Sequence, residues 1–202
     1  MTFGAVFPRV MRPAFGPGLA AAAGAALYIE DSFTGANGTN LNGWTPDIAN
    51  TPGNTWVAAL QSWSIISNRA RGTNFQPSLL VIETGVADGV ITMPAARGSF
   101  ENGIAFRWVD NNNHWRAIIS SVSGFALVEV TSGTETTRTF TSPADITTVA
   151  TITVTLSGNS ISADYKSTNL SYISSQHSSA TKHGVYRRDW IDSGVAEWWK
   201  MV

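Results

Sequence analysis

The chain has 202 residues, 43% of them hydrophobic, which is enough for the core of one domain rather than two. The formal net charge of -1 gives no basic surplus for nucleic-acid binding, and the absence of cysteine excludes disulfides, zinc–thiolate sites and cysteine nucleophiles. Only 13% of the residues are charged, and Ser, Thr, Asn and Gly replace the missing charge, which is typical of extracellular or virion β-proteins.

The first predicted element is an extended N-terminal arm, residues 1–28. Pro8, Pro13 and Pro17 interrupt an apolar run, and each favours extended backbone. The GLAAAAGAALYI that follows is too short to span a bilayer. The arm is either a secretory signal or an assembly arm that binds a neighbouring protein, and we favour the latter because prolines interrupt the basic part of the signal. Its partner-binding residues would be Phe3, Val6, Phe7, Val10, Met11 and Phe15.

From residue 29 to residue 202 the pattern changes to short β runs separated by turn residues. This regular spacing predicts an all-β antiparallel sandwich with few helices. The clearest run is 150–156, where Ile152, Val154 and Leu156 alternate with threonines before a turn at 157–159 that predicts a hairpin. The candidate strands are 78–84, 89–94, 103–109, 114–120, 125–130, 137–141, 150–158, 160–166, 182–188 and 196–202.

A family resemblance rests on short motifs in a fixed order over roughly residues 30–202. The motifs are Asp31-Ser-Phe33, Gly38-Thr-Asn-Leu41-Asn-Gly43-Trp44, Trp56, Trp63-Ser-Ile65, Gly103-Ile-Ala-Phe106-Arg107, the Gly158 hairpin and Gly184-Val-Tyr186. Together they resemble the concanavalin A-like lectin/glucanase jelly roll in its laminin-G-like branch. The resemblance implies two antiparallel sheets packed face to face, one of them curved. With the arm, the chain also resembles small phage virion proteins that decorate a tail, fibre or head.

Little in the sequence supports catalysis. A glycosidase needs two carboxylates that flank the scissile bond, and the glucanase motif Glu-x-Asp-x-x-Glu is absent. Each of five glutamates lacks a second acidic residue at strand spacing: Glu83, Glu101, Glu129, Glu135 and Glu197. No serine has the G-x-S-x-G setting that a triad histidine would activate. Asp110 could ligate calcium, but a single acidic residue in Asp-Asn-Asn-Asn favours a turn over a metal site.

The segment GIAFRWVDNNNHWRAII, residues 103–119, predicts a hairpin whose turn occupies 110–113. That turn would place Trp108 opposite Trp115 and Arg107 opposite Arg116. A second turn at 121–124 would place Arg116 opposite Glu129. Alternation then predicts a core face and a mixed face. The core face would hold Ile104, Phe106, Trp108, Trp115, Ala117, Ile119, Ala126, Val128 and Val130, and the mixed face Ala105, Arg107, Val109, His114, Arg116, Ile118, Leu127 and Glu129.

The mixed face carries the candidate ligand-binding residues Arg107, His114, Arg116 and Glu129. Like charges opposite one another on a sheet are unfavourable, so the arginines require an anion. Either Glu129 supplies it and the row is structural, or the face binds an acidic glycan or another protein.

We therefore expect a non-enzymatic virion protein, with the arm bound to other virion proteins and the body exposed to host-surface glycans or stabilising the assembly. Because the arm needs partners, a homo-oligomer is expected. The alternatives are a secreted carbohydrate-binding module and, third, an unusual glycoside hydrolase. No cofactor, nucleic-acid partner or membrane span is expected.

Overall fold

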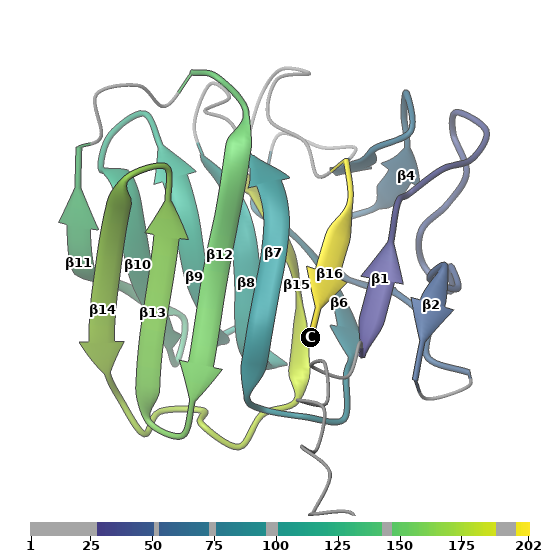
Figure 1. Cartoon of the computed structure of the whole chain (residues 1–202). Helices are drawn as coiled ribbons and strands as arrows, with labels where there is room; N and C mark the ends of the chain where they lie inside the picture. The colour runs from purple at the N-terminus through teal and green to yellow at the C-terminus, as the bar shows by residue number, and fades with distance from the viewer. Residues whose placement is uncertain (1–27, 51–52, 73–75, 96–100, 143–146, 189–196) are drawn as a thin grey trace, which may run out of the picture.

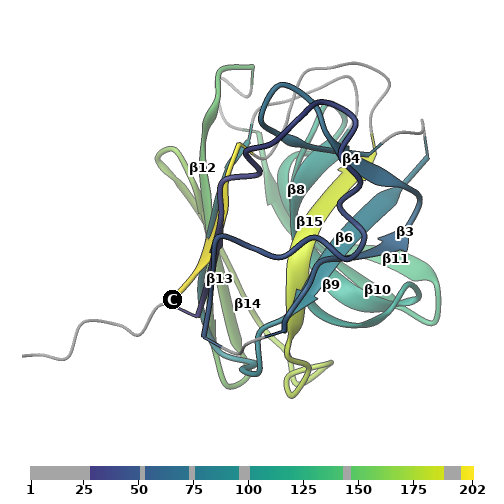
Figure 2. The ribbon, with the colours of Figure 1, turned by 90° about the vertical axis from the view of Figure 1, so that its right-hand side faces the viewer.

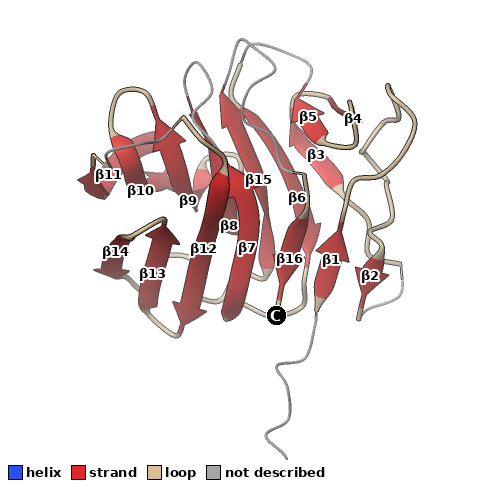
Figure 3. Ribbon diagram, turned by 45° about the horizontal axis from the view of Figure 1, so that its top comes forward, coloured by secondary structure: helices blue, strands red, loops and turns tan. Residues whose placement is uncertain are grey.

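A computed structural model describes residues 28–50, 53–72, 76–95, 101–142, 147–188 and 197–202. Every regular element in these ranges is a strand, and every strand pair is antiparallel (Figure 3). The strands form two seven-stranded sheets that pack face to face, which confirms the predicted all-β sandwich. The predicted arm residues 1–27 lie outside the described residues. No described segment is a helix of the length and hydropathy needed to cross a bilayer.

The front sheet of Figure 1 has the order β14-β13-β12-β7-β16-β1-β2. Its strands are β14 (Thr168–Ile173), β13 (Ser160–Tyr165), β12 (Ala150–Ser157), β7 (Gly89–Ala95), β16 (Trp199–Met201), β1 (Ile29–Asp31) and β2 (Ile48–Ala49). Tyr28 already joins this sheet, because its N–H donates to Met201 O at 3.0 Å and its carbonyl accepts from Asn50 N at 2.8 Å. The body of the domain thus includes Tyr28.

The back sheet has the order β11-β10-β9-β8-β15-β6-β3. Its strands are β11 (Thr134–Thr141), β10 (Gly124–Thr131), β9 (Asn113–Ser120), β8 (Glu101–Asp110), β15 (Lys182–Arg188), β6 (Ser78–Glu83) and β3 (Val57–Leu60). A small ribbon of β4 (Trp63–Ile65) and β5 (Ala70–Gly72) lies beside the sandwich. All ten predicted strands are present, whereas β14 and the short strands β1 to β5 were not predicted.

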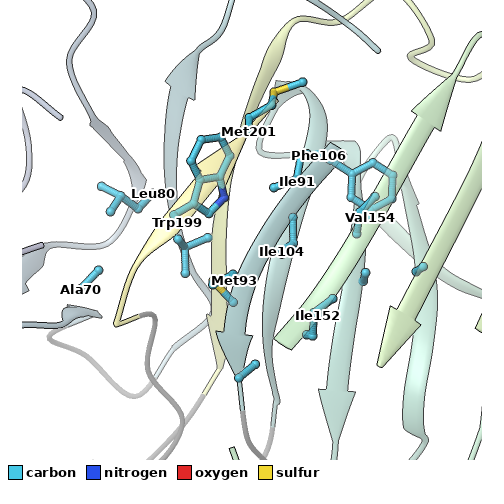
Figure 4. Close-up of a cluster of buried hydrophobic side chains, with 14 of the residues drawn as sticks. Ala70, Leu80, Ile91, Met93, Ile104, Phe106, Ile152, Val154, Trp199 and Met201 are labelled. Atoms are coloured by element: carbon cyan, nitrogen blue, oxygen red, sulfur yellow. The ribbon is translucent and has the colours of Figure 1, made fainter. Parts of the chain in front are cut away.

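The main core lies between the two sheets. The β12 alternation is confirmed: Ile152, Val154 and Leu156 are buried in this core, and the predicted hairpin joins β12 to β13 with Ser157 paired to Ser160. Figure 4 shows side chains of both sheets meeting in it, among them Ile91, Met93, Ile104, Phe106, Val154 and Trp199. Trp56 and Trp63, two of the motif residues, are buried in the same core.

The back sheet is curved. Figure 2 shows β3 and the β10–β11 hairpin farther from the front sheet than β8 and β15. β11 nevertheless contacts β14 of the front sheet, where Arg138 lies over the Tyr172 ring. Gly103 in β8 and Gly184 in β15 permit close approach of neighbouring strands there. A Cβ at Gly103 would overlap the carbonyl oxygen of Ala117, and one at Gly184 would overlap that of Leu80. Glycine in a strand interior marks such bends and close backbone contacts.

Candidate functional site

The β8–β9 hairpin has a tighter turn than predicted. Asp110 pairs with Asn113, so only Asn111 and Asn112 lie between the strands. Asp110 Oδ1 accepts hydrogen bonds from the Asn112 N–H at 2.7 Å and from Asn113 Nδ2 at 2.9 Å. These bonds hold the pKa of Asp110 below its usual value. Asp110, the weak metal candidate, therefore acts as the acceptor of an Asx turn.

A β-bulge in β8 overturns the predicted pairing of Arg107 with Arg116. Phe106 pairs with Trp115 and the register shifts before Asp110, while Arg116 pairs with Ala105. Arg107 has φ of 50°, a left-handed conformation that is uncommon for a non-glycine residue. The bulge turns Arg107 away from the mixed face of the prediction and toward the front sheet.

In this position Arg107 makes contacts within the fold. Its buried guanidinium donates from Nη2 to Gly158 O at 2.5 Å and to Asp88 Oδ1 at 3.2 Å, and Asp88 Oδ2 accepts the Gly158 N–H at 2.7 Å. Burial lowers the pKa of Arg107, and the charge of Asp88 opposes that shift. The Arg107 N–H donates to His183 Nδ1 at 3.2 Å. Arg107 thus joins the bulge to the β12–β13 turn.

Glu129 also lies away from the predicted row. Gly124 pairs with Ser120, so the β9–β10 turn contains residues 121–123, one fewer than predicted. A one-residue slip moves every side chain of a strand to the other face. Glu129 therefore points inward, where it accepts a hydrogen bond from Arg138 Nε at 2.6 Å. Arg138 in turn lies over the ring of Tyr172 on the front sheet. The predicted pairing of Arg116 with Glu129 is wrong, since Val128 lies opposite Arg116.

The β8 bulge and the shorter β9–β10 turn also change which residues lie on each face of the back sheet, relative to the prediction. Ile104, Phe106, Trp115, Ala117 and Ile119 lie in the main core as predicted. Four predicted core residues lie instead on the outer face: Trp108, Ala126, Val128 and Val130. Conversely, Leu127 is in the main core. The β10 errors follow from the shorter turn, and the Trp108 error follows from the bulge.

His114 and Arg116 do share the outer face of the back sheet. There they border a second buried apolar cluster of Leu79, Ala105, Ile118, Ala126, Val128 and Tyr186. We call Trp108, His114, Arg116, Glu135 and Tyr186 the outer-face site. Two of these five, His114 and Arg116, are among the ligand-binding residues predicted from the sequence. Glu135 and Tyr186 come from β11 and β15, and only strand order brings them to β9.

Arg116 is the centre of the outer-face site. It is 1% exposed, and its Cζ lies 4.2 Å from the centroid of the Tyr186 ring. Its Nη2 lies 2.8 Å from Glu135 Oε1. That ion pair lacks hydrogen-bond geometry, because Nε and Nη2 have no hydrogen-bond partner among the described residues. The Tyr186 hydroxyl donates to Glu101 Oε2 at 3.1 Å, and burial raises the pKa of Tyr186.

His114 and Trp108 add polar atoms beside Arg116. His114 Nδ1 lies 3.3 Å from Asp110 O. Burial, together with the charge of Arg116, lowers the pKa of His114 to about 4, so the ring is neutral at pH 7. His114 Nε2 and Trp108 Nε1 are buried without a hydrogen-bond partner in the described part of the chain. Lys182 Nζ lies 5.1 Å from the centroid of the Trp108 ring.

Comparison with known proteins shows the fold. No family model and no curated protein matches the sequence. The chain is similar to the carbohydrate-binding module CBM66 from Bacillus subtilis, with a TM-score of 0.56 and 12% identity over 70% of this chain and 90% of that one. It is also similar to part of the GH43 protein BlXynB from Bacillus licheniformis, with a TM-score of 0.49 and 10% identity over 86% of this chain. The chain spans 39% of the length of BlXynB. The sandwich is thus shared with a carbohydrate-binding module at low sequence identity.

Proposed function

We propose that this chain is a non-catalytic carbohydrate-binding module and that it binds glycan at the outer-face site. The observation that carries the proposal is Arg116, a buried guanidinium stacked on Tyr186 with two nitrogens that lack hydrogen-bond partners among the described residues. Buried polar groups in native proteins are almost always hydrogen-bonded. Donors left without a partner beside an aromatic ring are groups that a polyhydroxylated ligand can satisfy.

The chemistry of the neighbouring residues suits a sugar. Trp108 supplies an indole that can pack against the apolar face of a ring, and its N–H is a donor. His114 is neutral, so Nε2 can serve as either donor or acceptor to a hydroxyl. Small-molecule sites combine apolar walls with a few placed polar groups in this way. The similarity in fold to CBM66, a carbohydrate-binding module, supports the same proposal.

The positions of the glutamates support a binding role over hydrolysis. Three of them contact a cation: Glu129 binds Arg138, Glu135 pairs with Arg116 and Glu197 pairs with Arg69. Glu101 accepts from the Tyr186 hydroxyl, and Glu83 accepts from the Gly85 N–H. A glycosidase needs one carboxyl group as acid and a second as base or nucleophile across the same bond. We therefore propose that the chain does not cleave the glycan it binds.

A glycan array probed with the full chain tests this function. We expect binding to a defined glycan class, and Trp108→Ala should weaken it by about tenfold through lost aromatic packing. Thr155→Ala is the matched control, because Thr155 is exposed on the outer face of the front sheet. Thermal melting of both variants checks that they fold. Absence of binding to every glycan would overturn the proposal, and release of a shortened product would overturn its non-catalytic part.

Attachment to a virion, homo-oligomerisation and the location of the protein stay predictions. They depend on residues 1–28, of which the structure describes only Tyr28. The partner-binding residues predicted in the arm, Phe3 to Phe15, lie outside the described residues. Co-purification of the chain with particles, with and without residues 1–27, would test this attachment.

A further inference from the structure

We infer that the glycan is acidic and that its carboxylate or sulfate replaces the Glu135 carboxylate on Arg116. This inference rests on the proposed function and adds the chemical class of the ligand. Arg116 is almost fully buried, so its charge has lost most of its hydration. A buried cation is costly unless an anion both neutralises it and accepts its hydrogen bonds. The Glu135 carboxylate neutralises Arg116, with Oε1 2.8 Å from Nη2, but it accepts no hydrogen bond from that group.

A second arginine–glutamate pair, Arg138 on β11 with Glu129 on β10, has the geometry of a structural ion pair. Arg138 Nε donates to Glu129 Oε2 at 2.6 Å, and the side chain of Glu129 is 4% exposed. In the Arg116 pair the carboxylate is the exposed partner, since the side chain of Glu135 is 48% exposed. Glu135 also lies on β11, the edge strand of the back sheet. Its carboxylate can therefore move into water at little cost and leave Arg116 to another anion.

Arg116 is suited to an incoming oxyanion. Guanidinium groups bind carboxylates and sulfates through two parallel N–H bonds, and Nε and Nη2 form one such pair of donors on the same side of the group. Both lack a hydrogen-bond partner within the described residues. Lys182 over Trp108 adds positive charge beside the site, and Glu101 is occupied by the Tyr186 hydroxyl. When Glu135 moves out, the site holds a positive charge with two free donors.

The test compares polygalacturonate with its fully methyl-esterified form, which is the same polymer without its charges, by isothermal titration calorimetry on the full chain. Dextran sulfate against dextran is the sulfate arm and distinguishes the two sources of negative charge. We expect the charged polymer of at least one pair to bind about tenfold more tightly than its neutral form, as for a hydrogen bond to a charged group. Arg116→Gln should remove this preference.

Two glutamate variants keep the inference testable even if Arg116→Gln fails to fold. Glu135→Gln removes the competing carboxylate and should tighten binding of the acidic polymer by about threefold or more. Glu197→Gln makes the same change in net charge in a pair with Arg69 of similar exposure, 43% at Glu197, and should leave binding unchanged. Equal effects of the two variants would overturn the inference, because bulk charge would then explain both.

Failure of the inference differs from failure of the proposed function. If neutral polymers bind as tightly as charged ones, the acidic class is wrong and the carbohydrate-binding function stands. If no neutral or acidic glycan binds the folded chain, the proposed function itself is wrong.

Discussion

The buried imidazole of His183 should make the fold sensitive to acid. His183 is 0% exposed, its Nδ1 accepts the Arg107 N–H at 3.2 Å, and its Nε2 lies 3.1 Å from Val86 O. These partners fix the neutral tautomer that carries its proton on Nε2. Protonation would place a second N–H on Nδ1, pointing at the Arg107 N–H, and would break that bond. Burial, with the charge of Arg107, lowers the pKa of His183 to about 4.

The sign of the effect follows from this lowered pKa. Between about pH 4 and the ordinary histidine pKa of about 6.5, the unfolded chain binds more protons than the folded chain. The stabilisation that neutral His183 gives to the folded chain is therefore complete above about pH 6.5 and is lost as the pH falls toward 4. From pH 7.5 to pH 4.5 the loss due to His183 is about 2 to 3 kcal/mol of unfolding free energy.

Urea unfolding followed by tryptophan fluorescence at these two pH values measures the loss. His183→Asn keeps an acceptor for the Arg107 N–H but cannot titrate, and it should cost about 1 kcal/mol at pH 7.5 through the lost bond to Val86 O. Between pH 7.5 and 4.5 this variant should lose about 2 to 3 kcal/mol less than the parent chain. His177→Asn, which makes the same substitution in the loop between β14 and β15, is the control for removing a histidine. Parallel losses in His183→Asn and the parent would refute the reasoning.

Four variants test other parts of the structure by the same unfolding assay. Burial raises the pKa of Asp31 to about 6, so Asp31 stabilises the fold as the pH falls from about 6 to 4, and Asp31→Asn should remove that gain of about 3 kcal/mol; an unchanged pH profile would contradict this. Gly184→Ala should cost about 1 to 3 kcal/mol or more, because its Cβ would overlap the Leu80 carbonyl oxygen; a neutral effect would show that the strands can separate there. Glu129→Gln should cost about 2 kcal/mol and Glu135→Gln less than about 1 kcal/mol, because only the former loses a buried, well-formed hydrogen bond; equal costs would contradict the distinction between the two pairs.

The fold was predictable where local alternation and burial agree. In β12, threonines alternate with Ile152, Val154 and Leu156, so one sheet face meets water and the other meets the core. The strand β14 was missed because Leu170 is its one buried apolar residue, while Tyr172 is partly exposed and Ile173 is 80% exposed. Its place in the sheet comes from pairing with β13, a tertiary contact.

The site was less predictable, because two local shifts in strand pairing decide which side chains share a face. The three-residue turn after β9 reverses the alternation of β10 and moves Glu129 inward. The bulge at Arg107 needs a left-handed backbone that the sequence around it does not favour. Its partners are Asp88, Gly158 and His183, all distant in sequence. A reading of the hairpin alone contains none of these contacts.

The two arginines that look equivalent in the sequence of the hairpin have opposite roles because of the bulge. Arg107 reaches Asp88 and the Gly158 carbonyl beside the front sheet through Nη2, although its Nε and Nη1 also lack hydrogen-bond partners among the described residues. Arg116 lies on the outer face. Its partner carboxylate, Glu135, is on the edge strand β11, and its Nε and Nη2 lack hydrogen-bond partners among the described residues. Had β8 continued without the bulge, Arg107 and Arg116 would have opposed each other, and the repulsion would have cost stability. The bulge removes that repulsion and leaves Arg116 on the outer face, available to a ligand.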